Sequence, residues 1–215
     1  MAKKYIVLAG NIGAGKSTLV GMICQRFGWK AYYEPVAENP YLERFYDDMK
    51  QWAFHSQVYF MTHRVKSHHA LAGDPFSVVQ DRSIYEDAEV FAKNLYMRGE
   101  ISEDDYATYR ELYRVFTCLL PVPDLVVYIR ASVATLQKRI ASRGRGFEAA
   151  IGDEYLAGLN RLYEEWISSF TLAPILIIPG DELDFVENPA DLHRILDRLE
   201  KRLKDKQLLL FPARA

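Results

Sequence analysis

Cysteine is scarce in this sequence. Its 215 residues include two cysteines, Cys24 and Cys118, and neither belongs to a C-x-x-C pair. Both lie among apolar neighbours in the sequence. We therefore expect two buried thiols in a protein of a reducing compartment.

Long apolar runs are also missing. A helix that crosses a membrane needs about 20 consecutive apolar residues, and no segment approaches that length. The apolar run at residues 5–9 is too brief for the core of a signal peptide, and it leads directly into a glycine-rich loop. We expect a cytoplasmic protein with no membrane partner.

The chain has no excess of basic charge. Its 27 Lys and Arg residues face 29 Asp and Glu residues, which gives a net charge of −2. Proteins that bind nucleic acid polymers usually carry a strong basic excess, so we expect no such partner. Hydrophobic residues make up 49% and charged residues 26%, which is ordinary for a globular protein. This length and composition predict one domain that spans residues 1–215.

Short apolar runs alternate with longer segments of helical pattern. The runs, at residues 5–9, 30–33, 76–80, 125–129 and 174–178, are apolar along most of their length, as in strands buried on both faces. The predicted helices span about 16–27, 40–70, 84–118, 132–142, 153–170 and 189–206. This alternation predicts an α/β fold with a parallel sheet between layers of helices.

A phosphate-binding loop is the strongest motif. The first predicted strand runs into G-x-x-x-x-G-K-S at residues 10–17, and a helical pattern follows. Glycines let successive N–H groups point at one anion, and the helix N-terminus adds partial positive charge. Lys16 would reach the outer phosphates, and Ser17 would offer its hydroxyl to Mg²⁺. The residues expected to bind ATP here are Gly10, Asn11, Ile12, Gly13, Ala14, Gly15, Lys16, Ser17 and Thr18.

Further charged residues follow the other predicted strands, where open α/β sheets bind ligands. Glu34 follows the second strand, and Asp81 and Arg82 follow the third. Arg143 and Arg145, with glycines between and after them, suit a mobile lid over about residues 143–150. Taken singly, these could be a solvated strand exit, a surface ion pair and a solvated helix end. Beside a phosphate loop they favour phosphoryl transfer.

The motifs together resemble the deoxynucleoside kinase family. GNIGAGKST, EPV, WAFHSQ, DRSIYED, RGRGFE and LDF occur in this order along nearly the whole chain. The resemblance implies a P-loop kinase fold with five parallel strands flanked by helices, a short arginine-rich lid and often a homodimer. It also implies ATP-dependent phosphorylation of the 5′-hydroxyl of a deoxynucleoside, with Mg²⁺.

The resemblance also implies catalytic roles. Glu34 of EPV looks like the acceptor of the 5′-hydroxyl proton. Asp81 is the alternative acceptor, and its other implied role is to hold Mg²⁺ together with Ser17. Arg82 looks like a partner of Glu34, the 5′-oxygen and the phosphate, so Glu34 and Arg82 also count among the residues expected to bind the substrate. Lys16, Arg143 and Arg145 would neutralise charge as the phosphoryl group moves.

Binding roles follow in the same way. Tyr46 and Glu148 resemble the pair that holds the sugar 3′-hydroxyl. Gln57 resembles the reader of the base edge, because an amide offers a donor beside an acceptor. The expected walls of the base pocket are Phe54, Met61 and Phe91. The residues expected around the adenine of ATP are Arg139, Asp184 and Phe185.

Arg64 and Asp87 bear on base choice. Family members that favour deoxycytidine or deoxypurines resemble this pair, and a thymine methyl group would crowd it. The alternative is a structural salt bridge between two helices. The lid departs from the commoner family pattern because Phe147 stands where an acid is usual.

Two rival functions stay open on the sequence alone. One is a nucleoside monophosphate kinase on the same fold, and the other is a non-catalytic nucleotide-binding subunit. Among bases, adenine and guanine are favoured over cytosine, but the sequence does not decide between them.

Overall fold

A five-stranded parallel sheet forms the centre of the molecule. The computed structural model describes residues 3–33, 38–145, 148 and 151–208. The strands are β1 (Tyr5–Gly10), β2 (Lys30–Tyr32), β3 (Val78–Asp81), β4 (Leu125–Arg130) and β5 (Ile175–Pro179). Their order in the sheet is β2-β3-β1-β4-β5, and every neighbouring pair is parallel. The predicted α/β fold is confirmed.

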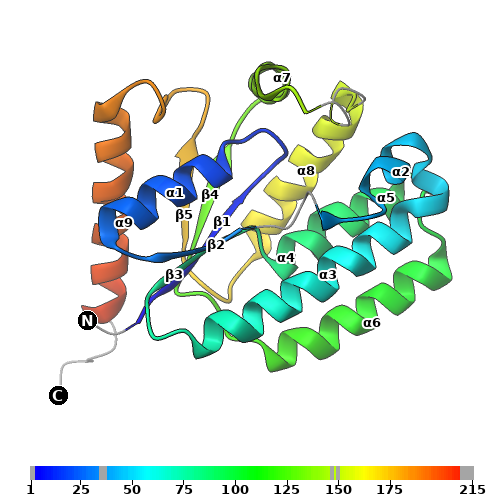
Figure 1. The fold of residues 1–215 in the computed structure, drawn as a ribbon, viewed down its shortest axis with the longest axis horizontal. Helices are drawn as coiled ribbons and strands as arrows, with labels where there is room; N and C mark the ends of the chain where they lie inside the picture. Colours follow the sequence, from blue (N-terminus) through cyan, green and yellow to red (C-terminus); the bar gives the residue numbers. More distant parts are fainter. Residues whose placement is uncertain (1–2, 34–37, 146–147, 149–150, 209–215) are drawn as a thin grey trace.

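Helices cover both faces of this sheet (Figure 1). They are α1 (Lys16–Phe27), α2 (Leu42–Asp47), α3 (Met49–Gly73), α4 (Ile84–Glu86), the π-helical segment η2 (Asp87–Ala92), α5 (Lys93–Met97), α6 (Glu103–Leu119), α7 (Val133–Arg143), α8 (Asp153–Ser169) and α9 (Pro189–Leu208). Helix α1 packs on β1, β2 and β3, α9 packs on β5, and α8 packs on η2. No helix among the described residues is long and apolar enough to span a bilayer.

The edge strands differ from the prediction. Strands β1 and β3 are buried along their whole length, and so is β4 except for its last residue. Strands β2 and β5 have partly or fully exposed residues. They form the two edges of the sheet, so each has a neighbouring strand on only one side. An apolar run indicates a strand, but it does not distinguish a central strand from an edge strand.

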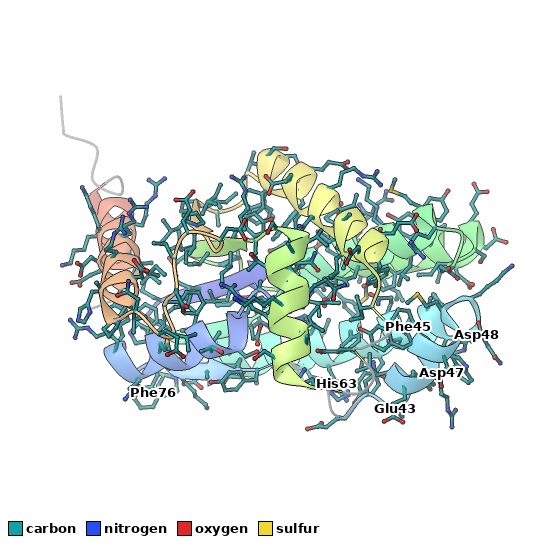
Figure 2. All side chains as sticks on the ribbon, turned by 90° about the horizontal axis from the view of Figure 1, so that it is seen from above. Glu43, Phe45, Asp47, Asp48, His63 and Phe76 are labelled. Atoms are coloured by element: carbon teal, nitrogen blue, oxygen red, sulfur yellow. The ribbon has the colours of Figure 1, made fainter. Side chains whose placement is uncertain are left out.

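Two predicted long helices are broken. Residues 40–70 divide at Asp48, whose carboxylate accepts a hydrogen bond from the N–H of Gln51 and so caps α3. Asp47 and Asp48 lie at the end of the molecule remote from α9 (Figure 2). Residues 84–118 divide between α5 and α6, where Gly99 has a positive φ of 73° and Ser102 caps α6. These residues are sequence signals for helix ends, but the prediction followed the longer helical pattern and placed no break there.

The prediction of two buried thiols is wrong for Cys118. This residue is exposed near the end of α6, and Cys24 is only partly buried in α1. Both are free cysteines. Burial raises the pKa of Cys24 to about 11. Apolar sequence neighbours mislead at Cys118 because among the α6 residues only Tyr109 is fully buried.

A buried polar cluster links α3 to the sheet. His68 of α3 has no exposed surface, and its Nε2 contacts the hydroxyl of Tyr5, which also bonds the side chain of Gln80. Burial, together with the nearby charge of Arg64, lowers the pKa of His68 from 6.5 to about 4. His68 is therefore neutral in the folded protein at neutral pH.

Acid should destabilise the protein through His68. Between pH 6.5 and about 4 the unfolded chain binds a proton at this residue and the folded chain does not, so stability falls as the pH falls. The expected loss is about 3 kcal/mol. We expect His68→Gln to flatten the pH dependence of the free energy of unfolding, measured by urea titration from pH 7 to 4. His69→Gln, a change at the exposed neighbour, should keep the wild-type slope. Equal slopes in all three proteins would contradict this account.

Candidate active site

Two cavities meet at the carboxyl edge of the sheet. The α3 cavity, of about 410 Å³, extends from the phosphate loop to Ser56, Gln57 and Phe60 of α3. The α7 cavity, of about 850 Å³, extends from the same loop along α7 to residues 180–187. The side chains and glycine common to both are Gly13, Lys16, Ser17, Arg143 and Arg145. Two molecules could therefore meet at these residues.

The phosphate loop follows β1 and ends where α1 begins. Gly13 has a φ of +80°, and an added Cβ would lie 2.9 Å from the carbonyl oxygen of Leu136 and 2.8 Å from Cγ1 of Ile140. Only glycine fits this close approach to α7. Nζ of Lys16 donates to the carbonyls of Gly10 (2.9 Å) and Asn11 (3.0 Å). The ammonium group is thus held at the loop.

Ser17 and Asp81 lie side by side. The Ser17 hydroxyl donates to Oδ2 of Asp81, and Oδ1 of Asp81 is buried without a hydrogen-bond partner among the described residues. A hydroxyl beside a carboxylate oxygen is a donor set that Mg²⁺ accepts. The structure therefore brings the two predicted metal-binding residues together, and Oδ1 of Asp81 is the oxygen that could coordinate a metal ion.

Arg82 adopts an uncommon backbone conformation. Its φ of 68° is the one positive value among the described residues other than glycine, and such strain is found most often at functional sites. The guanidinium lies 4.1 Å from the centre of the Phe91 ring, and Nη1 donates to the Tyr163 hydroxyl at 3.2 Å. The arginine is thus aimed from the end of β3 along the α3 cavity, which both Arg82 and Phe91 line.

Arg64 and Asp87 form a buried two-point ion pair between α3 and η2. Nε of Arg64 lies 3.0 Å from Oδ2 of Asp87, and Nη2 lies 3.4 Å from Oδ1. Asp87 lines the α3 cavity, but Arg64 does not. Nη1 of Arg64 also donates to the carbonyls of Asp81 (2.9 Å) and Arg82 (3.1 Å). The pair therefore borders the cavity and also anchors the turn after β3.

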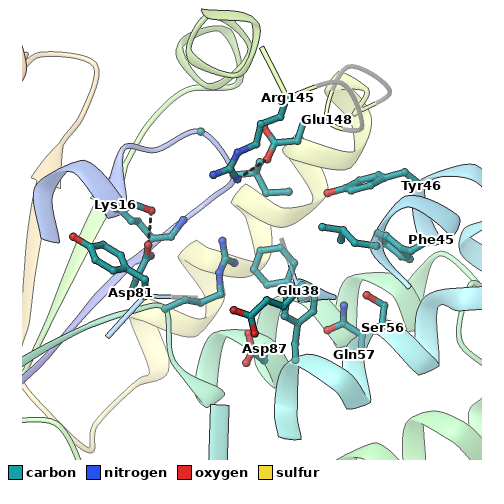
Figure 3. Close-up of a pocket in the computed structure, with 18 of the residues that line it drawn as sticks. Lys16, Glu38, Phe45, Tyr46, Ser56, Gln57, Asp81, Asp87, Arg145 and Glu148 are labelled. Carbon is teal, nitrogen blue, oxygen red and sulfur yellow. Dashed lines mark hydrogen bonds and ion pairs between the residues drawn. The ribbon is translucent and has the colours of Figure 1, made fainter. Parts of the chain in front are cut away.

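The walls of the α3 cavity agree with the prediction only in part. Tyr46, Gln57, Phe91 and Glu148 line it, and Tyr46 reaches in from α2 whereas Glu148 comes from the lid segment (Figure 3). Phe54 and Met61 do not line it. Met61 is in the core, 1% exposed, and Phe54 packs against His55. Additional walls are Leu42, Phe45, Ser56 and Phe60. Ser56 and Phe60 of α3 line the cavity beside Gln57. Helical spacing alone does not show which side of α3 faces the cavity.

Glu148 holds the described lid arginines. Its Oε2 accepts from Nε of Arg143 at 3.1 Å and also from Nη2, and its Oε1 accepts from Nη1 of Arg145 at 3.4 Å. Glu148 is buried, whereas the two arginines are partly exposed. Gly146 and Phe147 of the lid lie outside the described residues, as does Glu34.

Arg139, Asp184 and Phe185 line the α7 cavity together. Arg139 donates to the carbonyls of Ala14 (3.0 Å) and Gly180 (2.8 Å). Backbone N–H groups of Glu187 and Val186 lower the pKa of Asp184. The buried ring of Phe185 packs at Gly15. Arg139 thus ties the phosphate loop to the loop after β5.

Glu86 is a site residue that sequence reasoning missed. It is fully buried, and its Oε1 accepts from the N–H of Gly10 (3.2 Å) and the Tyr163 hydroxyl (2.9 Å). Oε2 accepts from the N–H of Ser83 at 3.0 Å. Burial raises the pKa of Glu86, and the charges of Arg82 and Lys16 oppose that effect. The S-x-x-E spacing of a capping box, confirmed here for Ser83 and Glu86, was the available signal.

Comparisons with known proteins identify the family. The sequence model of the deoxynucleoside kinases matches residues 6–204. This chain belongs to the deoxynucleoside kinase family.

The relatives cover nearly the whole chain. The deoxyadenosine/deoxycytidine kinase of Bacillus subtilis (strain 168) is 37% identical over 204 residues, which are 94% of each protein. The deoxyguanosine kinase of the same organism is 38% identical over 89% of this chain and 93% of its own. The deoxyadenosine kinase of M. mycoides, solved with the products dCMP and dCDP, superposes with a TM-score of 0.82 at 34% identity, over 92% of this chain and 99% of that one.

The protein is therefore a deoxynucleoside kinase, an enzyme that transfers a phosphoryl group to an alcohol. The predicted P-loop kinase fold is confirmed by these neighbours. A kinase must bind a phosphoryl donor and a phosphoryl acceptor so that both meet at the transferred phosphate. Two cavities that meet at the phosphate loop suit two such molecules.

Gly13→Ala should damage nucleotide binding in this deoxynucleoside kinase. The new methyl group would meet the carbonyl of Leu136 in a conformation that L-residues adopt reluctantly. We expect ATP to bind about 5- to 30-fold more weakly in calorimetry, from strain of about 1–2 kcal/mol. Gly73→Ala is the matched control, since its methyl group would meet nothing within 4 Å. Unchanged ATP affinity in Gly13→Ala would show that the loop tolerates this shift.

Proposed function

We propose that this kinase transfers the γ-phosphoryl group of ATP to the 5′-hydroxyl of a purine deoxynucleoside, deoxyadenosine or deoxyguanosine, in nucleotide salvage. Deoxycytidine is the alternative substrate. The proposal is carried by one observation: two cavities meet at Lys16, Ser17 and the lid arginines. It is supported by relatives named as deoxyadenosine, deoxyguanosine and deoxycytidine kinases.

ATP would occupy the α7 cavity and the phosphate loop. Arg139, Asp184 and Phe185 line the cavity end where the adenine would lie. Residues 10–18 would surround the triphosphate, with their amides and the α1 N-terminus directed at its charge. The γ-phosphoryl group would then lie where the cavities meet.

The deoxynucleoside would occupy the α3 cavity. Tyr46 and Glu148 would hold the 3′-hydroxyl, and Gln57 would pair with the base edge. The Phe91 ring, held beside Arg82, would pack on the base. The Arg64–Asp87 pair would border the base and disfavour thymine, because a methyl group there would crowd a buried ion pair.

The reaction is a single displacement. The 5′-oxygen forms a bond to the γ-phosphorus, and the bond from that phosphorus to the β–γ bridging oxygen breaks to release ADP. The hydroxyl proton passes to a carboxylate, for which Glu34 is proposed and Asp81 is the alternative. Lys16, Arg82, Arg143 and Arg145 would neutralise the moving charge.

Ser17 and Asp81 are the residues proposed to hold Mg²⁺. The buried Oδ1 of Asp81, which has no partner among the described residues, fits this role. When bound, Mg²⁺ supplies charge neutralisation at the phosphate oxygens.

A homodimer through α6 is also proposed. Val115 and Leu119 of α6 are 53% and 76% exposed, and Val122, which follows the helix, is 48% exposed. Exposed apolar side chains gathered on one element favour burial against a partner. Two free cysteines in the described part of the chain support a reducing, cytoplasmic location.

A substrate panel tests the proposed reaction. We expect ADP release from Mg²⁺–ATP with deoxyadenosine, deoxyguanosine or deoxycytidine, and none with thymidine or with the deoxynucleoside monophosphates. A Lys16→Met variant should be silent and controls for contaminating kinases. Turnover of monophosphates alone would assign a monophosphate kinase. Silence of the wild-type protein on every substrate would indicate a non-catalytic subunit, and rapid thymidine turnover would refute the proposed role of Arg64 and Asp87.

Two amide variants distinguish the candidate bases. If Glu34 accepts the proton, Glu34→Gln should lower kcat by about 10²-fold or more, with nucleoside KM nearly unchanged. Asp81→Asn should instead raise the Mg²⁺ concentration needed for half-maximal rate. Both quantities come from the same steady-state assay with varied Mg²⁺. Normal turnover in Glu34→Gln would remove Glu34 from the mechanism.

A further inference from the structure

Helix α8 contacts the phosphate loop at two points one helical turn apart. Nδ2 of Asn11 donates to Oδ1 of Asn160 at 2.8 Å and to the carbonyl of Leu156 at 3.0 Å. One turn later, the Tyr163 hydroxyl lies 2.7 Å from the carbonyl oxygen of Gly10. Residues three apart share a helix face, so one face of α8 holds the first two residues of the loop.

The Tyr163 hydroxyl lies at a junction of three groups. Its oxygen is 2.7 Å from the Gly10 carbonyl oxygen and 2.9 Å from Oε1 of Glu86, and it accepts from Nη1 of Arg82 at 3.2 Å. Tyr163 and Glu86 have no exposed surface. A hydroxyl carries one proton. It can therefore donate to Gly10 or to Glu86, but not fully to both.

The ring of Tyr163 is held in place. It stacks on Tyr128 with centroids 5.5 Å apart and meets Phe91 and Trp166 edge to face. Helix α8 itself is pressed on α5 at Gly158, where an added Cβ would lie 2.7 Å from Oδ1 of Asn94. The hydroxyl is thus pre-organised, and little freedom remains for it to lose on substrate binding.

A change in the bonding of Lys16 explains why the Tyr163 hydroxyl lies near two acceptors. Nζ of Lys16 donates to the Gly10 carbonyl at 2.9 Å. A lysine of this motif turns to the outer phosphates when a triphosphate binds, and the buried carbonyl of Gly10 then loses a donor. An unsatisfied buried carbonyl is costly. The Tyr163 proton lies within reach of this oxygen, while Glu86 keeps its bond from the Gly10 N–H.

We propose that Tyr163 is a positioning residue for phosphoryl transfer. Its hydroxyl holds Arg82 against the phosphate loop and supplies the hydrogen bond that the Gly10 carbonyl loses when Lys16 turns to the triphosphate. This inference rests on the proposed function, because Arg82 and Lys16 act on the transferred phosphoryl group there. Glu86 anchors the arrangement by binding Gly10, Ser83 and Tyr163 together.

Tyr163→Phe removes only the hydroxyl and tests the inference. We expect kcat to fall about tenfold and the KM for ATP to rise, since one hydrogen bond to a charged group is lost and Lys16 leaves an unsatisfied carbonyl. The KM for the nucleoside should change less than about twofold, because no nucleoside-binding residue is altered. Tyr128→Phe is the matched control. It removes the hydroxyl of the stacked ring, which bonds Glu164, and should leave all three constants near wild type.

A double-mutant cycle separates positioning from mere stability. If Tyr163 acts through Arg82, then Tyr163→Phe should cost much less kcat in an Arg82→Lys background than in the wild type. Equal losses in both backgrounds, a loss matched by Tyr128→Phe, or wild-type kcat and ATP KM in Tyr163→Phe would each overturn the proposal. If Tyr163→Phe does not fold, Glu86→Gln should show the same kinetic pattern, because an amide cannot accept from every donor around Glu86. A wild-type protein that phosphorylates no nucleoside would refute the proposed function instead, and the ATP affinity of Tyr163→Phe would still test the loop contact.

Discussion

The phosphate loop must hold a shape that directs backbone amide groups at an anion, and much of the site follows from that constraint. Only short bonds inside the loop shape it, from the N–H of Ile12 to Oδ1 of Asn11 and from the N–H of Ala14 to the Asn11 carbonyl, so carbonyls and side chains must also fix it. Other elements do this work: Arg139 of α7 holds Ala14, Asn160 of α8 holds Asn11, and Tyr163 binds Gly10. The loop is thus held by helices that follow it by more than a hundred residues.

The order of strands explains why these helices reach the loop. Strand β1 lies at the centre of the sheet between β3 and β4, so segments that follow both neighbours emerge beside Gly10. Asp81 and Arg82 come from the end of β3, and α7 and α8 follow β4. The α3 and α7 cavities lie on the two sides of the same loop because chain connections leave the sheet there in different directions. The order of the strands therefore places the two cavities beside one loop, and the side chains that line each cavity determine which molecule binds there.

The sequence identified motifs of consecutive residues, but it did not identify residues that only the fold brings together. The phosphate loop, Asp81 and the lid arginines each stand in a contiguous motif with a physical signature, and the five strands were located within two residues at each end. The walls of the α3 cavity were harder, because Phe54 and Met61 are apolar residues on the same helix as Gln57, and only packing determines which side is buried. Tyr163 and Glu86 lie far apart in the sequence, and no pattern in a single sequence connects them.

Gly158 lies at the contact of α8 with α5 and lines neither cavity. A single added methyl group there would press on the end of the buried Asn94 side chain, and where that side chain does not turn away, α8 has to move from α5. Asn160 and Tyr163 would move with it, so the disturbance would arrive at Gly10 and Asn11. A variant at this position would appear in a genetic screen as a defect in handling ATP, although the altered residue touches neither substrate. The cause would be a displacement of α8, which carries the residues that contact the phosphate loop.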